Sequence, residues 1–191
     1  MMEYVCGPAW DRRLFDITPK GNIGIMITGG LDSWVLYNLL VSTGSDITLF
    51  NVHRKDGFDN PDRVTLLTGK EVVKIEDKSQ HSGERVARGV DTILAEYPID
   101  QLYIAINRDP PVEHFPQFTM EGRPFRPWRI YHPRICAPFL QLYKYHIIDL
   151  ATSLNIDVGL TLSCIANNSD PCGDCWQCLE RRWGYEQLNK P

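Results

Sequence analysis

The chain has 191 residues, of which 43% are hydrophobic and 23% charged, proportions typical of a globular protein that can bury one substantial core. Its 20 basic and 24 acidic residues give a formal net charge of −4, which argues against general nucleic-acid binding and leaves a local basic patch open. The sequence contains neither an apolar stretch long enough for a membrane span nor a secretory signal, so we expect a cytoplasmic protein.

Strand-like and helix-like segments alternate along the chain. Short β-branched runs predict strands, and apolar residues at helical spacing predict helices. In order, we expect strand 22–28, helix 33–41, strand 46–52, helix 61–68, strand 71–75, helix 83–97, strand 101–107, helix 141–154 and strand 158–163. Gly44, Gly69 and Pro98 serve as stop signals for the first three helices. This alternation predicts an α/β fold with a doubly wound, parallel five-stranded sheet.

Residues 108–138 interrupt this rhythm. About thirty residues with seven prolines and no clear periodicity predict a long functional loop. Aromatic residues alternate there with arginines: Phe115, Phe118, Arg123, Phe125, Arg126, Trp128, Arg129, Tyr131 and Arg134. Such a set can stack a base or hold a carboxylate or phosphate, or it can pack the loop onto the domain with solvated arginines. His114 and His132 are more typical of surface residues than of an acid or base.

A glycine turn follows the first expected strand, with the sequence Thr28-Gly29-Gly30-Leu31-Asp32-Ser33. Two adjacent glycines let the backbone approach a ligand closely, and the N-terminus of the following helix favours an anion. The hydroxyls of Thr28 and Ser33 add donors, so the motif predicts a phosphate or pyrophosphate site. It is not a Walker loop, because no Lys follows the glycines. The alternative is a tight turn without a ligand, with Asp32 or Ser33 as the N-cap.

The six cysteines are unevenly placed. Cys6 and Cys136 are isolated, whereas four are crowded near the C-terminus: Cys164, Cys172, Cys175 and Cys178. Four thiolates can each lie about 2.3 Å from a zinc ion in a tetrahedral site, and Pro171 and Gly173 permit the necessary turns. With every position filled by a thiolate, the metal would be structural. A redox pair, an iron–sulfur cluster and free core cysteines are the alternatives.

These motifs also carry a family resemblance. Thr28–Ser33 resembles the loop Ser-Gly-Gly-x-Asp-Ser of the N-type ATP pyrophosphatases (the PP-loop superfamily), with Thr in place of the first Ser. Together with Thr161–Cys164 and Cys172–Arg182, it is similar to the 7-cyano-7-deazaguanine synthase family. Ala137-Pro138-Phe139 and Lys144 resemble the family segment in which a Thr-Pro pair precedes a helix that bears a lysine.

The resemblance implies an ATP-dependent carbon–nitrogen ligase that adenylates 7-carboxy-7-deazaguanine, uses ammonia to form the amide, and then converts the amide to the nitrile. It implies structural Zn²⁺ at the four cysteines, Mg²⁺ with the ATP, and a homodimer. It divides the chain into an ATP pyrophosphatase domain, 1–163, and a zinc-binding segment with a C-terminal helix, 164–191. The implied ATP-binding residues are Thr28, Gly29, Gly30, Leu31, Asp32 and Ser33. Asp32 and Lys144 are the implied catalytic residues, although Asp32 can instead cap the helix and Lys144 can be a solvated helix residue.

The middle of the chain departs from that family. Ser82-Gly83-Glu84-Arg85 stands where the family has Pro-Gly-Arg-Asn, a segment that helps form its substrate site. The same chemistry on another acceptor is therefore the first alternative, for example conjugation of a deazapurine to protein or a DNA-modification pathway. A tRNA-thiolating enzyme is disfavoured, because no further cysteine pair lies near the glycine turn. A non-catalytic module that binds zinc and nucleotide is the second alternative.

Overall fold

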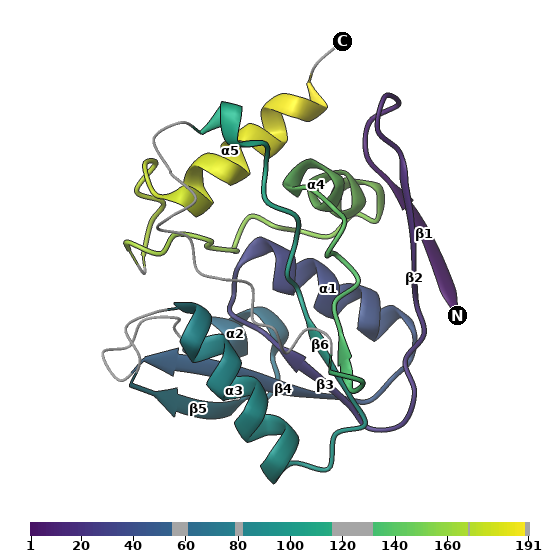
Figure 1. Cartoon of the computed structure of the whole chain (residues 1–191), viewed down its shortest axis with the longest axis vertical. Helices are drawn as coiled ribbons and strands as arrows, with labels where there is room; N and C mark the ends of the chain where they lie inside the picture. The colour runs from purple at the N-terminus through teal and green to yellow at the C-terminus, as the bar shows by residue number, and fades with distance from the viewer. Residues whose placement is uncertain (55–60, 79–81, 116–131, 168, 190–191) are drawn as a thin grey trace.

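Five parallel strands form the central sheet of the computed structural model (Figure 1). The structure describes residues 1–54, 61–78, 82–115, 132–167 and 169–189. The strands are β1 (Met2–Cys6), β2 (Arg13–Ile17), β3 (Ile23–Met26), β4 (Ile47–Arg54), β5 (Val73–Asp77), β6 (Gln101–Ile104) and β7 (Ile135–Cys136). The helices are α1 (Leu31–Ser42), α2 (Pro61–Thr68), α3 (Ser82–Glu96), α4 (Lys144–Ser153) and α5 (Trp176–Leu188), with a 3-10 helix, η1 (Val112–His114).

The strand order is β5-β4-β3-β6-β7, and all neighbouring pairs are parallel. Within this sheet the chain therefore starts at the central strand β3, moves outward through β4 and β5, and returns past β3 to add β6 and β7. Each face has its own hydrophobic core, because successive strand residues point to opposite faces. Leu49 packs with α1 and α4 on one face, and its neighbour Phe50 packs with α3 on the other. The predicted doubly wound α/β fold is confirmed.

The prediction of a strand at 158–163 is wrong. Both the backbone N–H and the hydroxyl of Thr161 donate to the carbonyl of Val158, at 3.1 and 2.6 Å, and the N–H of Gly159 donates to the Asp157 carboxylate at 2.8 Å. These bonds form a turn, which leaves no extended run for pairing. The fifth strand of the sheet is instead β7, which pairs with β6 through Leu102↔Ile135 and Tyr103↔Cys136.

The interpretation of 108–138 as one long loop is therefore wrong in part. This segment contains η1 and β7, the strand at the sheet edge. The remainder of the predicted aromatic and arginine loop, residues 116–131, lies outside the described residues and with it most of that set: Phe118, Arg123, Phe125, Arg126, Trp128, Arg129 and Tyr131. Within the described part, Phe115 is buried and Arg134 donates to the backbone carbonyls of Leu94 and Ile99.

An N-terminal hairpin that the sequence did not predict lies beside α1 and α4 (Figure 1). Strands β1 and β2 are antiparallel, with the register running from Met2↔Ile17 to Cys6↔Arg13. Cys6 and Ile17 belong to the core beneath the hairpin. The N–H of Gly7 donates to the Asp149 carboxylate of α4 at 2.8 Å, so backbone and side chain together hold the hairpin to the helix.

A buried histidine completes this attachment. His146 of α4 is fully buried, and its Nδ1 accepts the backbone N–H of Tyr143 at 3.0 Å. The proton therefore resides on Nε2, which donates to the carbonyl of Asp11 at 2.9 Å. Burial lowers the pKa of His146 and outweighs the nearby Asp11 carboxylate, which favours the charged ring. The native state thus requires a neutral imidazole at this junction.

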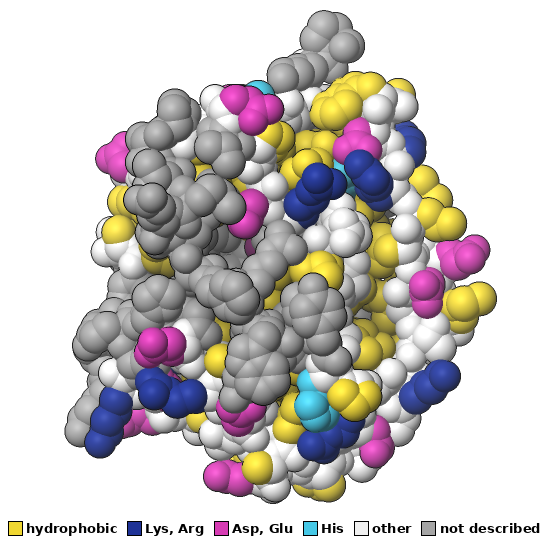
Figure 2. Space-filling view, viewed as in Figure 1, with side chains coloured by type: hydrophobic (Ala, Val, Ile, Leu, Met, Phe, Trp, Pro, Cys, Tyr) yellow, Lys and Arg dark blue, Asp and Glu magenta, His cyan; other side chains and the backbone are white. Residues whose placement is uncertain are grey.

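Charges on the described surface are mixed. On the face shown in Figure 2, Lys and Arg side chains are interspersed with Asp and Glu rather than gathered in one patch. Among the described residues, none of the helices combines the length and apolarity needed to cross a membrane.

Acidification should destabilise the fold through His146. The pKa of His146 is lower in the folded than in the unfolded state. The neutral side chain therefore contributes fully to the free energy of unfolding above the unfolded pKa of about 6.5, and this contribution is lost as the pH falls below that value. The loss is limited to about 1.4 kcal/mol per pH unit for one proton. Urea unfolding of wild type and His146→Gln between pH 5 and 8 measures this loss of unfolding free energy. The gap in unfolding free energy between the two proteins should narrow toward pH 5, and a gap independent of pH would contradict this assignment.

Candidate functional site

The glycine turn lies at the carboxyl end of β3, where the strand order reverses. Strand β3 has β4 on one side and β6 on the other, and such a switch point opens a crevice at the strand ends in doubly wound sheets. Gly29 has a positive φ of 78°, a conformation that glycine adopts without strain. Gly30 is the N-cap of α1, with extended backbone angles. The prediction that Asp32 or Ser33 would cap the helix in a turn without a ligand is therefore wrong as to the capping residue.

Hydroxyl groups fix the shape of this turn. Ser33 Oγ lies 3.2 Å from both the backbone N and the Oγ1 of Thr28, and it donates to the carbonyl of Gly30 at 3.2 Å. A second serine, Ser163, accepts the N–H of Leu31 at 3.3 Å. Next to it, the N–H of Leu162 donates to the carbonyl of Gly29 at 3.0 Å. The turn is thus stabilised by hydrogen bonds among its own residues and by hydrogen bonds with Leu162 and Ser163, which precede the cysteine cluster.

A cavity of about 260 Å³ opens beside the turn. Its polar end is formed by the glycine turn and its walls by apolar residues at the ends of three strands. Further lining comes from α3 and from the cysteine-bearing segment. The lining residues used below are Thr28, Gly30, Asp32, Ser33 and Arg85. A polar end next to an apolar slot suits the phosphates and the planar base of a nucleotide.

Lys144 connects three helices next to this cavity. Its side chain is only 2% exposed, and its Nζ lies 2.5 Å from Asp32 Oδ2 of α1 and 3.3 Å from Glu180 Oε2 of α5. The other oxygen of Glu180 accepts the side-chain amide of Asn107 at 2.7 Å. The interpretation of Lys144 as a solvated helix residue is wrong. Glu180 and Asn107 were not predicted as site residues.

The two carboxylates compensate for the burial of this ammonium. Burial lowers the pKa of Lys144, but the charges of Asp32 and Glu180 outweigh it and raise that pKa above its usual value. Burial raises the pKa of Glu180, and Lys144 opposes this rise. The second oxygen of Asp32, Oδ1, is buried without a hydrogen-bond partner among the described residues. The group therefore has one carboxylate oxygen available for a further cation.

The four crowded cysteines converge on one point. Their sulfur atoms all lie within 4.8 Å of one another, and the Sγ atoms of Cys175 and Cys164 are 3.9 Å apart. Tetrahedral metal–sulfur bonds of about 2.3 Å separate the ligands by about 3.8 Å, so the cluster fits a single ion. Gly173 has a positive φ of 84°, as its predicted role in a sharp turn requires. Cys175 is the N-cap of α5, so a bound ion would fix the start of that helix.

The thiols of the cluster differ in acidity. Burial alone would raise the pKa of the Cys164 thiol, but hydrogen bonds with the backbone of Cys172 and Ala166 lower that pKa to about 6. Burial raises the pKa of Cys178 to about 12. At neutral pH the metal-free cluster thus offers a thiolate at Cys164, which is the form that binds metal.

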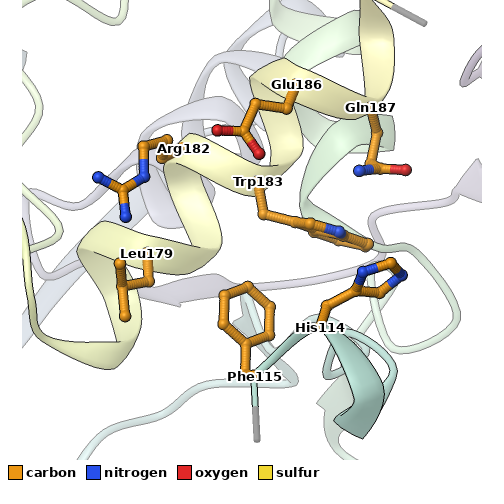
Figure 3. Close-up of a pocket in the computed structure, with 7 residues that line it drawn as sticks. All are labelled: His114, Phe115, Leu179, Arg182, Trp183, Glu186 and Gln187. Carbon is orange, nitrogen blue, oxygen red and sulfur yellow. The ribbon is translucent and has the colours of Figure 1, made fainter. Parts of the chain in front are cut away.

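A second cavity, of about 370 Å³, lies between η1 and α5 (Figure 3). It is lined by His114, Phe115, Leu179, Arg182, Trp183, Glu186 and Gln187. The ring centroids of His114 and Trp183 are 5.5 Å apart, and those of Phe115 and Trp183 are 6.2 Å apart. These contacts pack η1 against α5, and none of the lining residues belongs to the glycine turn or the cysteine cluster. The larger cavity is therefore separate from both motifs, whereas the smaller one adjoins the glycine turn and includes Cys164.

Comparison with known proteins bears out the resemblance for the C-terminal part of the chain. Residues 111–189 match the family described as "Queuosine biosynthesis protein QueC". The 7-cyano-7-deazaguanine synthase of Solidesulfovibrio magneticus is 48% identical over 56 residues, which are 28% of this chain and 24% of the relative. That of Methylococcus capsulatus is 43% identical over 56 residues, or 28% of this chain and 25% of the relative. The chain thus aligns with about a quarter of the length of these relatives.

Among solved structures, the chain is similar to the NMN synthetase of Francisella tularensis. The two share 16% sequence identity over 88% of this chain and 82% of the other, with a TM-score of 0.45.

Substitution of Lys144 by Met should destabilise the protein by about 3–5 kcal/mol, because it leaves the buried Glu180 and the partly buried Asp32 without their cation. Adding Glu180→Gln should recover a large part of this loss, since only one carboxylate then remains. Urea unfolding of the two single variants and the double variant measures the coupling. The assignment fails if the double variant is no more stable than Lys144→Met.

Cobalt provides a direct test of the cysteine cluster. The Co²⁺-loaded protein should show the absorption bands of a tetrahedral thiolate site, and Cys172→Ser should weaken them, because one of the four ligands is lost. Cys172 is exposed, so this change leaves no cavity in the core. Cys136→Ser, at a thiol outside the cluster, should leave the spectrum unchanged. Removal of the metal should lower the Tm of wild type.

Proposed function

We propose that this chain is an ATP-dependent carbon–nitrogen ligase of the PP-loop type, which adenylates a carboxylate and replaces the AMP with nitrogen. The observation that carries the proposal is the hydroxyl-bearing glycine turn at the switch point of the sheet, which opens into a cavity with apolar walls. The similarity of residues 111–189 to QueC supports the same chemistry. We expect the enzyme to act in the cytoplasm, because crowded free thiols are typical of a reducing compartment, and as a homodimer, as the resemblance implies.

In this proposal the glycine turn binds the pyrophosphate of ATP. The first turn of α1 directs backbone N–H groups and the positive end of the helix dipole toward the turn. Thr28 and Ser33 add hydroxyl donors, and Gly29 and Gly30 add no side chains of their own, although the Arg63 side chain lies beside Gly29. ATP supplies the activated phosphoryl group, and the chain contributes mainly by orienting it and by balancing its charge.

Asp32 has a different role, because a carboxylate repels a phosphate unless a cation lies between them. Its Oδ2 faces Lys144, and its Oδ1 is buried without a partner among the described residues. A carboxylate oxygen of this kind fits Mg²⁺, which prefers hard oxygen ligands and accompanies nucleotide phosphates. We assign Asp32 to the Mg²⁺ of Mg-ATP and Lys144 to charge balance at the same position.

The cysteine cluster fits a structural zinc ion. Four thiolates fill a tetrahedral shell and leave no position for water or substrate. In this proposal zinc fixes the start of α5 and the segment that ends at Cys164. That segment contributes Ser163 to the glycine turn, so zinc supports the nucleotide site without taking part in the reaction.

The proposed acceptor is 7-carboxy-7-deazaguanine, with ammonia as the nitrogen donor, because the matched relatives bear the name 7-cyano-7-deazaguanine synthase. A different carboxylate is the second candidate. Arg85 supports it: this side chain is 7% exposed and lines the cavity, in the segment where the sequence departs from the family. Both candidates require the same adenylation step and differ only in the acceptor.

Pyrophosphate release separates these candidates. The zinc-loaded protein is incubated with Mg-ATP, 7-carboxy-7-deazaguanine and ammonium, and products are followed by mass spectrometry. Conversion to the nitrile would establish the first candidate. Nucleotide binding without conversion would favour another acceptor or a non-catalytic module, and release of pyrophosphate with other carboxylates distinguishes those two. A folded, metal-loaded protein that does not bind ATP would refute the proposal.

Ser33→Ala should lower kcat/KM for ATP about tenfold or more, because it removes the hydroxyl that joins Thr28 to Gly30. Ser42→Ala is a matched control. Ser42 lies in the same helix and also donates to a carbonyl three residues earlier, that of Leu39, but at the opposite end. Steady-state kinetics should show less than a twofold change for Ser42→Ala. Equal losses in both variants would indicate a general effect on α1.

A further inference from the structure

The buried group around Lys144 contains more negative than positive charge. Two carboxylates, Asp32 and Glu180, share one ammonium. Both oxygens of Glu180 face donors, Lys144 at one and Asn107 at the other, which is the bonding pattern of an ionised carboxylate. Glu180 is 4% exposed, so water screens it little. The network therefore has an excess of one negative charge.

Among the carboxylate oxygens of this group that the structure describes, one has no hydrogen-bond partner. Glu180 uses both of its oxygens inside the protein, whereas Asp32 uses only Oδ2. Asp32 Oδ1 has no partner there, and Asp32 lines the nucleotide cavity. Without Glu180, Lys144 and Asp32 would form a neutral pair, and Asp32 would attract a cation less strongly. The charge of Glu180 thus sets how negative the electrostatic potential is at the Asp32 carboxylate beside the cavity.

The position of Glu180 is set independently of Lys144. It lies on α5 two residues after Cys178, a member of the cysteine cluster. The next residue, Arg181, donates to the carbonyl and hydroxyl of Thr161 at 3.0 Å and to the carbonyl of Val158 at 3.1 Å. Because these contacts hold α5 from both sides of Glu180, its carboxylate remains opposite Lys144 whether or not the cavity is filled.

We propose that Glu180 is a positioning residue that offsets the positive charge of Lys144. The negative charge of Asp32 then remains uncompensated, which makes Asp32 selective for the divalent cation of the nucleotide complex. This inference rests on the proposed function, since it requires a nucleotide in the smaller cavity. Its consequence is specific: Glu180 should favour the magnesium complex of ATP and should not favour free ATP.

The experiment measures the Kd of α,β-methylene-ATP by titration calorimetry, in 5-fold excess Mg²⁺ and in buffer freed of divalent ions, on the zinc-loaded protein. Glu180→Gln keeps the shape of the side chain and removes its charge. We expect it to weaken binding of the magnesium complex about tenfold and to leave binding of the free nucleotide unchanged or tighter. Glu180→Asp, which retains the charge, should preserve most of the preference for magnesium.

Two further variants sharpen the test. Glu186→Gln removes an exposed glutamate of the same helix and should change neither Kd. Asn107→Lys places a second ammonium beside Glu180 and should reduce the magnesium preference while Glu180 itself is unchanged, so it supplies the test if Glu180→Gln does not fold. The cobalt spectrum of each variant reports whether the cysteine cluster is intact.

Equal weakening of both nucleotide forms, or no change in either, would overturn the inference and leave the proposed function standing. Failure of the folded wild type to bind either form would refute the proposed function, and the inference with it.

Discussion

A lysine ammonium can be buried only if opposite charges surround it, and this constraint organises the functional end of the molecule. Lys144 at the start of α4 requires Asp32 from α1 and Glu180 from α5. Three helices from distant parts of the chain must therefore meet at one atom. The glycine turn, the cavity beside it and the start of α5 all lie within reach of this meeting point, so their arrangement depends on it.

The parts of the site that sequence reasoning predicted are those whose chemistry is local. Adjacent glycines with flanking hydroxyls indicate a phosphate turn within six residues, and Cys-x-x-Cys spacing indicates a metal cluster within a few more. Thr28 and Ser33 do contact one another, and the four clustered cysteines do converge. The same holds for the doubly wound sheet, because short β-branched runs alternating with helices reveal it without any knowledge of contacts.

The parts that escaped prediction depend on contacts between distant residues. Strand β7 has only two residues and gives no periodic signal; only its pairing with β6 identifies it. The segment 158–163 has strand-like composition, but local hydrogen bonds to Val158 and Asp157 fold it into a turn. Glu180 stands between Leu179 and Arg181 in an ordinary helix. Its partner is 36 residues earlier in the sequence, and no spacing rule connects the two.

The glycine turn lies near the beginning of the chain, yet the groups that support it come from near the end. Ser163 bonds to the first residue of α1, and Glu180 completes the surroundings of Lys144. During synthesis from the N-terminus, β3 and α1 can form early, but the turn lacks these supports until α5 has left the ribosome. A nascent or prematurely terminated chain would then have the glycine motif without its supporting contacts. Emergence of α5 is thus the step at which the glycine turn acquires its full support.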